Sequence, residues 1–207
     1  MIRNIVCDMG GVLIAWDPPM LVDRLGVAPE DKALLLREVF RSADWVAQDR
    51  GVVPQEEIVN NMCRRLPERL HRYAADFVYG WWKTPFVPIE GIDALLHELK
   101  ANGYTLYVLS NASRALHDYF PRLPGSDVFS GLVVSADWGI LKPDRELYRI
   151  LFREYGLNPE ECYFIDDSSL NVEAGITLGM HGSVFDGSIA RLRRELMEAG
   201  VTVSPMP

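Results

Sequence analysis

The residues best suited to do chemistry come where short apolar runs end. Asp8 follows the first such run, Ser110 and Asn111 follow a later one, and the pair Asp166 and Asp167 follows another. A carboxylate fixed at the end of a buried strand can act as a nucleophile, and a second carboxylate can help it hold Mg²⁺, which prefers oxygen ligands. A hydroxyl whose following amides open a helix suits a phosphate oxygen.

Lys142 adds a positive point charge from a loop that enters a helix at Pro143. Phosphoryl transfer needs an in-line nucleophile, cations that neutralise the phosphoryl oxygens and donors that hold them. Taken singly, each of these residues is more typical of a turn, a helix cap or a loop. Their occurrence together, in this order, favours a site for phosphoryl transfer.

These residues need a scaffold that brings them together. Apolar runs typical of buried strands alternate with helical patterns along most of the chain. The alternation predicts an α/β fold, a Rossmann-like doubly wound parallel sheet covered by helices on both faces. In such sheets ligands bind outside the carboxyl ends of the strands, where the polar residues fall. The expected strands are 2–7, 104–109, 132–134, 163–165 and 182–185, and the expected helices 92–101, 112–120, 143–155, 170–178 and 188–199.

The residue pattern differs in the segment from about Pro18 to Pro85. It contains amphipathic helical patterns at 31–40 and 55–66, is punctuated by prolines and has little strand character. We therefore expect a small all-helical cap at residues 16–86, inserted into a core made of residues 1–15 and 87–207.

Composition narrows the classes of partner. The chain has 207 residues and a formal net charge of -8, which argues against non-specific binding to nucleic acid or to an anionic membrane.

No apolar run approaches the roughly 20 residues of a spanning helix. The three cysteines are odd in number and form no CxxC, as expected for reduced thiols. Cleaving a leader would remove Asp8, so we expect a cytoplasmic protein, monomeric or homodimeric.

Four ordered segments resemble the motifs of haloacid dehalogenase-like hydrolases. They are DMGGVL at 8–13, LSN at 109–111, LKP at 141–143 and FIDDS at 164–168. The segment NVEAG at 171–175 is also similar to the residues that come after the fourth motif in that family. The helical insertion matches the cap of subfamily IA in size and place. Trp45 and the segment 49–51 resemble, more weakly, the branch of bacterial α-D-glucose-1-phosphate phosphatase.

The resemblance implies a Mg²⁺-dependent phosphatase for a small phosphorylated metabolite. Its nucleophile would attack phosphorus to form an aspartyl phosphate, which water then hydrolyses. The implied roles are nucleophile and metal ligand for Asp8, metal binding for the Gly10 carbonyl and Asp167, phosphoryl binding for Ser110, the Asn111 backbone and Lys142, and orientation of these groups for Asp166 and Asn171.

One position departs from the family pattern. Most phosphatases that the chain resembles carry a second Asp two residues after the nucleophile, as general acid and base, and here that residue is Gly10. Such catalysis contributes roughly 10²–10⁴-fold. An anomeric sugar oxygen or an acyl group leaves with less help, which favours a sugar phosphate or an acyl phosphate as substrate. Asp17 is a candidate substitute, although a loop acid is the more ordinary interpretation.

Two other functions stay open. A metal-free 2-haloacid dehalogenase also uses an aspartate nucleophile, but the pair Asp166 and Asp167 would then serve no purpose. A non-catalytic protein that binds a phosphate ligand or a partner is allowed by Gly10 and opposed by the retained motifs. Five residues of the cap are candidates for substrate contact, although packing of the Trp side chains and solvation of the Arg side chains are the more ordinary explanations. They are Arg41, Trp45, Arg50, Trp81 and Trp82.

Overall fold

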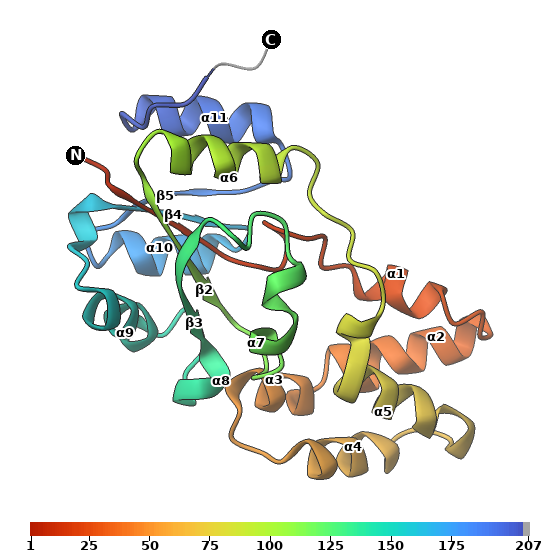
Figure 1. Cartoon of the computed structure of the whole chain (residues 1–207). Coiled ribbons are helices and arrows are strands. Elements are labelled where there is room, and N and C mark those ends of the chain that lie inside the picture. The colour runs from red at the N-terminus through yellow and green to blue at the C-terminus, as the bar shows by residue number, and fades with distance from the viewer. Residues whose placement is uncertain (205–207) are drawn as a thin grey trace.

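The computed structural model describes residues 1–204 and has five parallel strands in one sheet (Figure 1). The order is β3-β2-β1-β4-β5, so β1 is central and the chain builds first one side of the sheet and then the other. The predicted doubly wound α/β fold is therefore confirmed, with its topological switch point at β1. The strands are β1 Asn4–Cys7, β2 Thr105–Ser110, β3 Phe129–Val134, β4 Cys162–Asp166 and β5 His181–Val184.

Both faces of the sheet are covered, which explains why β1 is buried throughout and mostly apolar. Ile5 and Cys7 point into a cluster with residues of α6 (Ile92–Ala101) and α11 (Ile189–Glu198). Val6 points the other way, towards α9 (Arg145–Tyr155) and α10 (Ser169–Ile176). Figure 1 shows these two helix pairs on opposite sides of the sheet.

Helices fill the chain between β1 and α6 and lie together beyond one end of the sheet (Figure 1). The two segments that join this insertion to the sheet pair with each other, antiparallel, at Ile14 and Pro88. The division into a core and a cap at residues 16–86 remains our proposal, and this pairing supports it. The elements are α1 Pro18–Asp23, α2 Pro29–Leu35, a π-helical turn Leu36–Phe40, α3 Ala43–Arg50, α4 Gln55–Cys63, a 3₁₀ turn Glu68–Leu70, α5 His71–Gly80 and a 3₁₀ turn Trp81–Lys83.

Some elements differ from the prediction, and β3 begins at Phe129 instead of residue 132. The helix expected at 112–120 shortens to α7, Leu116–Tyr119, followed by a 3₁₀ turn at Phe120–Arg122. One further turn, α8 at Ser135–Trp138, was not predicted, because four residues are too few to show a helical period. Gly139 ends α8 in the left-handed conformation at φ 72°.

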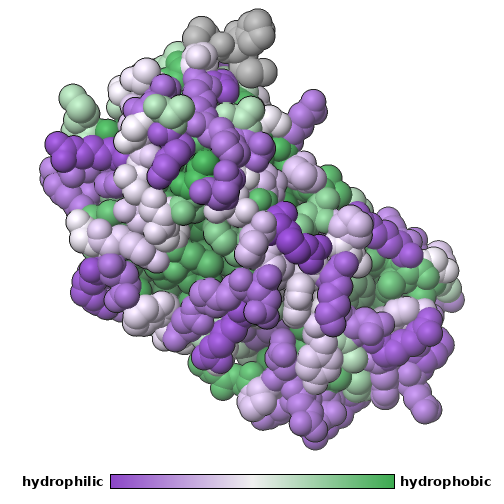
Figure 2. Space-filling model, in the orientation of Figure 1, coloured by the Kyte–Doolittle hydropathy of each residue, from purple (hydrophilic) through white to green (hydrophobic). Residues whose placement is uncertain are grey.

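Polar residues dominate the face of the molecule in Figure 2, with apolar residues visible in the recesses between them. Within residues 1–204, no helix combines the length and the apolar character that a membrane crossing requires.

Candidate active site

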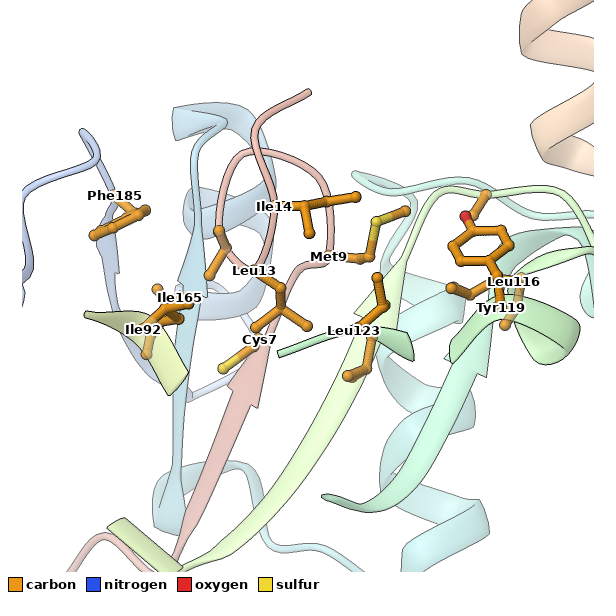
Figure 3. Packing of buried hydrophobic residues seen from close by; sticks show 14 of the residues in the cluster. Cys7, Met9, Leu13, Ile14, Ile92, Leu116, Tyr119, Leu123, Ile165 and Phe185 are labelled. Atoms are coloured by element: carbon orange, nitrogen blue, oxygen red, sulfur yellow. The ribbon is translucent and has the colours of Figure 1, made fainter. Parts of the chain in front are cut away.

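The site begins where β1 ends. The Asp8 amide donates to the Ile165 carbonyl at 2.9 Å, which prolongs the pairing of β1 with β4 by one residue. The loop that follows is anchored by the buried side chains of Met9, Leu13 and Ile14, which pack into the core (Figure 3). The Met9 amide donates to Asp8 Oδ1 at 2.6 Å. The carboxylate is therefore held at the carboxyl edge of the sheet with little freedom.

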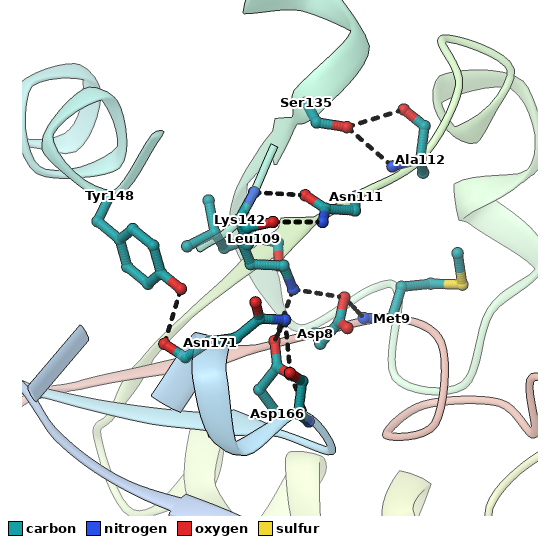
Figure 4. A network of polar contacts seen from close by, with 11 residues as sticks. Asp8, Met9, Leu109, Asn111, Ala112, Ser135, Lys142, Tyr148, Asp166 and Asn171 are labelled. Carbon is teal, nitrogen blue, oxygen red and sulfur yellow. Dashed lines mark hydrogen bonds and ion pairs between the residues drawn. The ribbon is translucent and has the colours of Figure 1, made fainter. Parts of the chain in front are cut away.

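Lys142 is the cationic centre of the site (Figure 4). Its side chain is 0 % exposed, and Nζ lies 3.0 Å from Asp8 Oδ1 and 2.7 Å from Asp166 Oδ2. Nζ also donates to the Leu109 carbonyl at 2.8 Å, so its three donors meet three acceptors. Burial alone lowers the pKa of Lys142, but the attraction of both carboxylates outweighs it and raises that pKa. The residue therefore stays charged.

Asp166 is fully buried, and its carboxylate is occupied by protein donors. Besides Lys142, it accepts from the Ser168 amide at 2.8 Å and from Asn171 Nδ2 at 3.0 and 3.2 Å. Asn171 is in turn held by Tyr148, whose hydroxyl donates to the Asn171 carbonyl at 2.7 Å (Figure 4). The arrangement fits the expected role of Asp166 and Asn171 in orienting Lys142.

Three carboxylates meet at this edge of the sheet. Oxygens of Asp8, Asp166 and Asp167 lie within 4.8 Å of one another. Burial raises the pKa of Asp8 to about 6, with Lys142 opposing the rise, and burial followed by the charge of Asp166 raises the pKa of Asp167. A cation would relieve this repulsion. Because Asp166 is engaged by protein donors, Asp8 and Asp167 are the carboxylates available to a metal ion.

The glycines after Asp8 make room for two neighbouring side chains. Gly11 has φ +77°, and a Cβ there would lie 2.3 Å from Asp167 Oδ2. A Cβ on Gly10 would lie 3.3 Å from Cβ of Trp16, closer than most real contacts. Where the family pattern places a second Asp, this chain therefore has the Trp16 side chain packed against bare backbone.

Gly11→Ala should impair metal binding beyond its cost to the backbone. The positive φ alone costs about 1–2 kcal/mol, and the added methyl must also displace the Asp167 carboxylate. Gly26→Ala is the matched control, because Gly26 has φ +64° and nothing within 4 Å of its Cβ position. We expect Gly11→Ala to lose more stability than Gly26→Ala in urea unfolding, because its methyl also displaces a side chain, and only Gly11→Ala to need several-fold more Mg²⁺ for half-maximal activity. Equal Mg²⁺ requirements would contradict the assignment of Asp167.

Ser110 and Asn111 differ in what their side chains do. Asn111 binds the backbone of Lys142 in both directions, accepting from its amide at 2.7 Å and donating to its carbonyl at 3.0 Å. Ser110 Oγ is buried without a hydrogen-bond partner in the part of the chain described. A buried unpaired hydroxyl is costly, so this one points to a ligand that completes the site. Ser110 and Asn111 both line the cavity beside Asp8.

That cavity has a volume of about 220 Å³ and opens between the sheet edge and the helical insertion. Four aromatic side chains form much of its wall: Trp16, Trp45, Trp81 and Tyr119. Among the described residues that line it, none is Arg, Lys or His.

Several candidates from the sequence lie elsewhere. The side chains of Arg41 and Arg50 are exposed and do not line the cavity, and Trp82 stacks on the outer side of Tyr119, with ring centroids 5.8 Å apart. Asp17 is the N-cap of α1 and accepts from the Met20 amide at 3.1 Å, so it does not replace an acid at Gly10.

Asp49 is a site residue that the sequence did not single out. It lies in the last turn of α3 and lines the cavity together with Asp8. Burial raises the pKa of Asp49 well above its usual range, and the negative charge of Asp8 raises it further. Only the weak similarity of segment 49–51 to one branch of the family hinted at this position.

The fold and this ordered set of residues define a class of hydrolase, and the comparisons agree. The family model of haloacid dehalogenase-like hydrolases matches residues 2–179, so the chain belongs to that family. Sesquiterpene phosphatase astK of Aspergillus oryzae is 29% identical over 89% of this chain and 90% of its own length. D-ribitol-5-phosphate phosphatase of Bacteroides thetaiotaomicron is 26% identical over 86% of this chain and 89% of its own.

Solved structures share the fold. A haloacid dehalogenase-family enzyme of B. thetaiotaomicron, in complex with magnesium and inorganic phosphate, superposes with a TM-score of 0.70 at 21% identity, covering 93% of this chain and 99% of that one. The L-2-haloacid dehalogenase of Xanthobacter autotrophicus gives 0.66 at 17% identity, covering 98% and 85%. The curated relatives make this chain a phosphoric monoester hydrolase, in preference to the dehalogenase and non-catalytic alternatives.

Proposed function

We propose that this protein is a Mg²⁺-dependent phosphatase that hydrolyses a small phosphorylated metabolite through an aspartyl phosphate on Asp8. The observation that carries the proposal is the Asp8–Lys142–Asp166 contact beside Asp167 and the unpaired Ser110 hydroxyl. Asp8, Asp167 and the Gly10 carbonyl would hold Mg²⁺, which when bound neutralises charge on the phosphoryl oxygens.

The chain's own groups account for the remaining requirements. An Asp8 oxygen attacks phosphorus, and the bond from phosphorus to the leaving oxygen breaks with its electron pair on that oxygen. Ser110 and the Asn111 backbone would hold the phosphoryl oxygens while this occurs, and Lys142, 3.0 Å from Asp8 Oδ1, would attract them through its charge. Water then attacks phosphorus, releasing inorganic phosphate and the free Asp8 carboxylate. The buried Lys142–Asp166 pair keeps a fixed positive charge next to the reacting oxygens.

The residues of the cavity wall restrict the charge and polarity of the leaving groups that can bind. Trp16, Trp45 and Trp81 offer flat apolar faces, and no described cavity residue is a cation that could bind a second anionic group of the substrate. Substrates with one phosphoryl group and an uncharged leaving group rich in C–H therefore fit best. A sugar phosphate, whose ring can stack on Trp, and the phosphate of an apolar alcohol both meet this description.

Phosphate release from a panel of esters tests the proposal. The panel contains sugar 1- and 6-phosphates, an isoprenoid monophosphate, nucleoside 5′-diphosphates, phosphoserine and acetyl phosphate, each with Mg²⁺ or with EDTA. We expect turnover that EDTA abolishes and Mg²⁺ restores, and we expect the diphosphates and phosphoserine to be the poorest substrates. Turnover unaffected by EDTA would contradict the metal requirement, and no turnover of any ester by folded protein would overturn the proposal.

We also propose a cytoplasmic location, supported by the cysteine content. Cys7, Cys63 and Cys162 are all free thiols, as expected in a reducing compartment.

A further inference from the structure

We propose that Asp49, supplied by the helical insertion, is the general acid and base of the reaction and takes the role that Gly10 leaves open. The proposal rests on the phosphatase function proposed above. Three observations support it. Asp49 lines the cavity, contacts with the core fix the end of its helix, and the other two acids that line the cavity have proposed roles of their own.

Asp49 lines the same cavity as the nucleophile Asp8 and Gly10, although it comes from α3 and they come from the end of β1. Two effects raise the pKa of Asp49, first burial and then the charge of Asp8, while a hydrogen bond from the Trp45 side chain opposes them. A carboxyl group in this position can carry a proton when the substrate arrives, as a general acid requires.

The end of α3 is fixed against the core. Ser135, at the start of α8, donates through Oγ to the Asp49 carbonyl and accepts from the Ala112 amide at 3.0 Å. Gly51 ends α3 with φ 71°, and a Cβ there would lie 2.3 Å from the Ala136 carbonyl oxygen. The backbone of Asp49 is therefore tied to the same loop that carries the phosphoryl-binding residues.

The other groups in the cavity have other uses. Three carboxylates line it, and two of them, Asp8 and Asp167, are the proposed nucleophile and metal ligand. Burial raises the pKa of the Tyr119 hydroxyl, which makes it a poorer proton donor at neutral pH. Within the described residues of the wall, Asp49 is the carboxyl group left for proton transfer.

The step balances without another reactant. As the Asp8 oxygen bonds to phosphorus and the ester bond breaks, protonated Asp49 gives its proton to the leaving oxygen, which departs as a neutral alcohol. The Asp49 carboxylate then takes a proton from water as the water oxygen attacks phosphorus and the bond to Asp8 breaks. Phosphate leaves, Asp8 is restored and Asp49 is protonated again.

The test compares two classes of leaving group. An alkyl phosphate needs a proton on its leaving oxygen, whereas p-nitrophenyl phosphate expels a stabilised anion and does not. We expect Asp49→Asn to lower kcat for the alkyl ester by about 10²–10⁴-fold and for the aryl ester by less than about 10-fold. Asp44→Asn is the matched control on the same helix, because the Asp44 carboxylate pairs with Arg65 outside the cavity, and it should change neither rate.

Asp49→Glu is a control for loss of activity through structural damage. It retains a carboxyl group and should recover part of the alkyl-ester rate. Equal losses on both esters, or no loss on either, would overturn the role of Asp49 while leaving the phosphatase function intact. Failure of the wild type to turn over either ester would instead overturn both proposals.

Discussion

Asp8→Asn is expected to lower turnover by roughly 10⁴–10⁶-fold, as loss of a covalent nucleophile does in other hydrolases. The amide has nearly the shape of the carboxylate, and Lys142 retains its contacts with Asp166 and Leu109. The loss would therefore reflect chemistry and not collapse of the site. Acid quenching during turnover of a radiolabelled ester should trap labelled wild-type protein, and the label should be absent from the variant.

Asp167→Asn is the companion variant for this experiment. It retains the nucleophile and should still form the labelled intermediate, but only at higher Mg²⁺ concentration, because one of the two carboxylates available to the metal is lost. Wild-type rates in Asp8→Asn, or trapping of label on that variant, would show that another group attacks phosphorus.

Lys142→Met should be the most damaging substitution for stability, at about 3–5 kcal/mol. Methionine retains most of the length of the side chain but leaves Asp8 and Asp166 buried without their cation. Removing that cation raises the pKa of Asp8 further above its wild-type value of about 6. The loss of stability from this group should therefore grow as the pH rises through about 6, where the wild-type carboxylate ionises beside its cation and the variant carboxylate cannot. Urea unfolding at several pH values measures it.

A double variant separates charge from packing. Lys142→Met with Asp166→Asn removes one of the two stranded charges and should recover part of the lost stability at neutral pH. It should not recover activity, because no fixed cation then lies beside the phosphoryl oxygens. A double variant no more stable than the single one would show that the contacts of Lys142 matter through packing and not through charge.

Much of the fold could be predicted because the strands are short apolar runs with polar residues at their ends. Asp8, Ser110 and Asp166 stand at such ends, and a parallel sheet places the ends of β1, β2 and β4 side by side. Helix α6 was predicted with its observed bounds because its buried residues recur at helical spacing.

What the sequence missed depends on how distant elements meet. Ser135 and Ala136 hold the end of α3, and although Gly51 permits this close approach, the local sequence does not show which distant residues meet it. The packing of Trp16 against Gly10 is likewise a tertiary feature. Val201 and Val203, which follow α11, are buried against the core, and a segment this short shows no periodicity from which that docking could be inferred.

The origin of the cavity wall has a consequence for how such proteins diversify. Trp45, Trp81 and Asp49 all come from the insertion between β1 and α6, whereas Asp8, Ser110 and Asp167 come from the sheet and its loops. If the proposed role of Asp49 holds, exchanging this one segment would exchange the binding surface and the proton donor together. Leaving-group recognition and leaving-group activation would then be inherited as a single module, which a recombination event could transfer without altering the phosphoryl-transfer machinery.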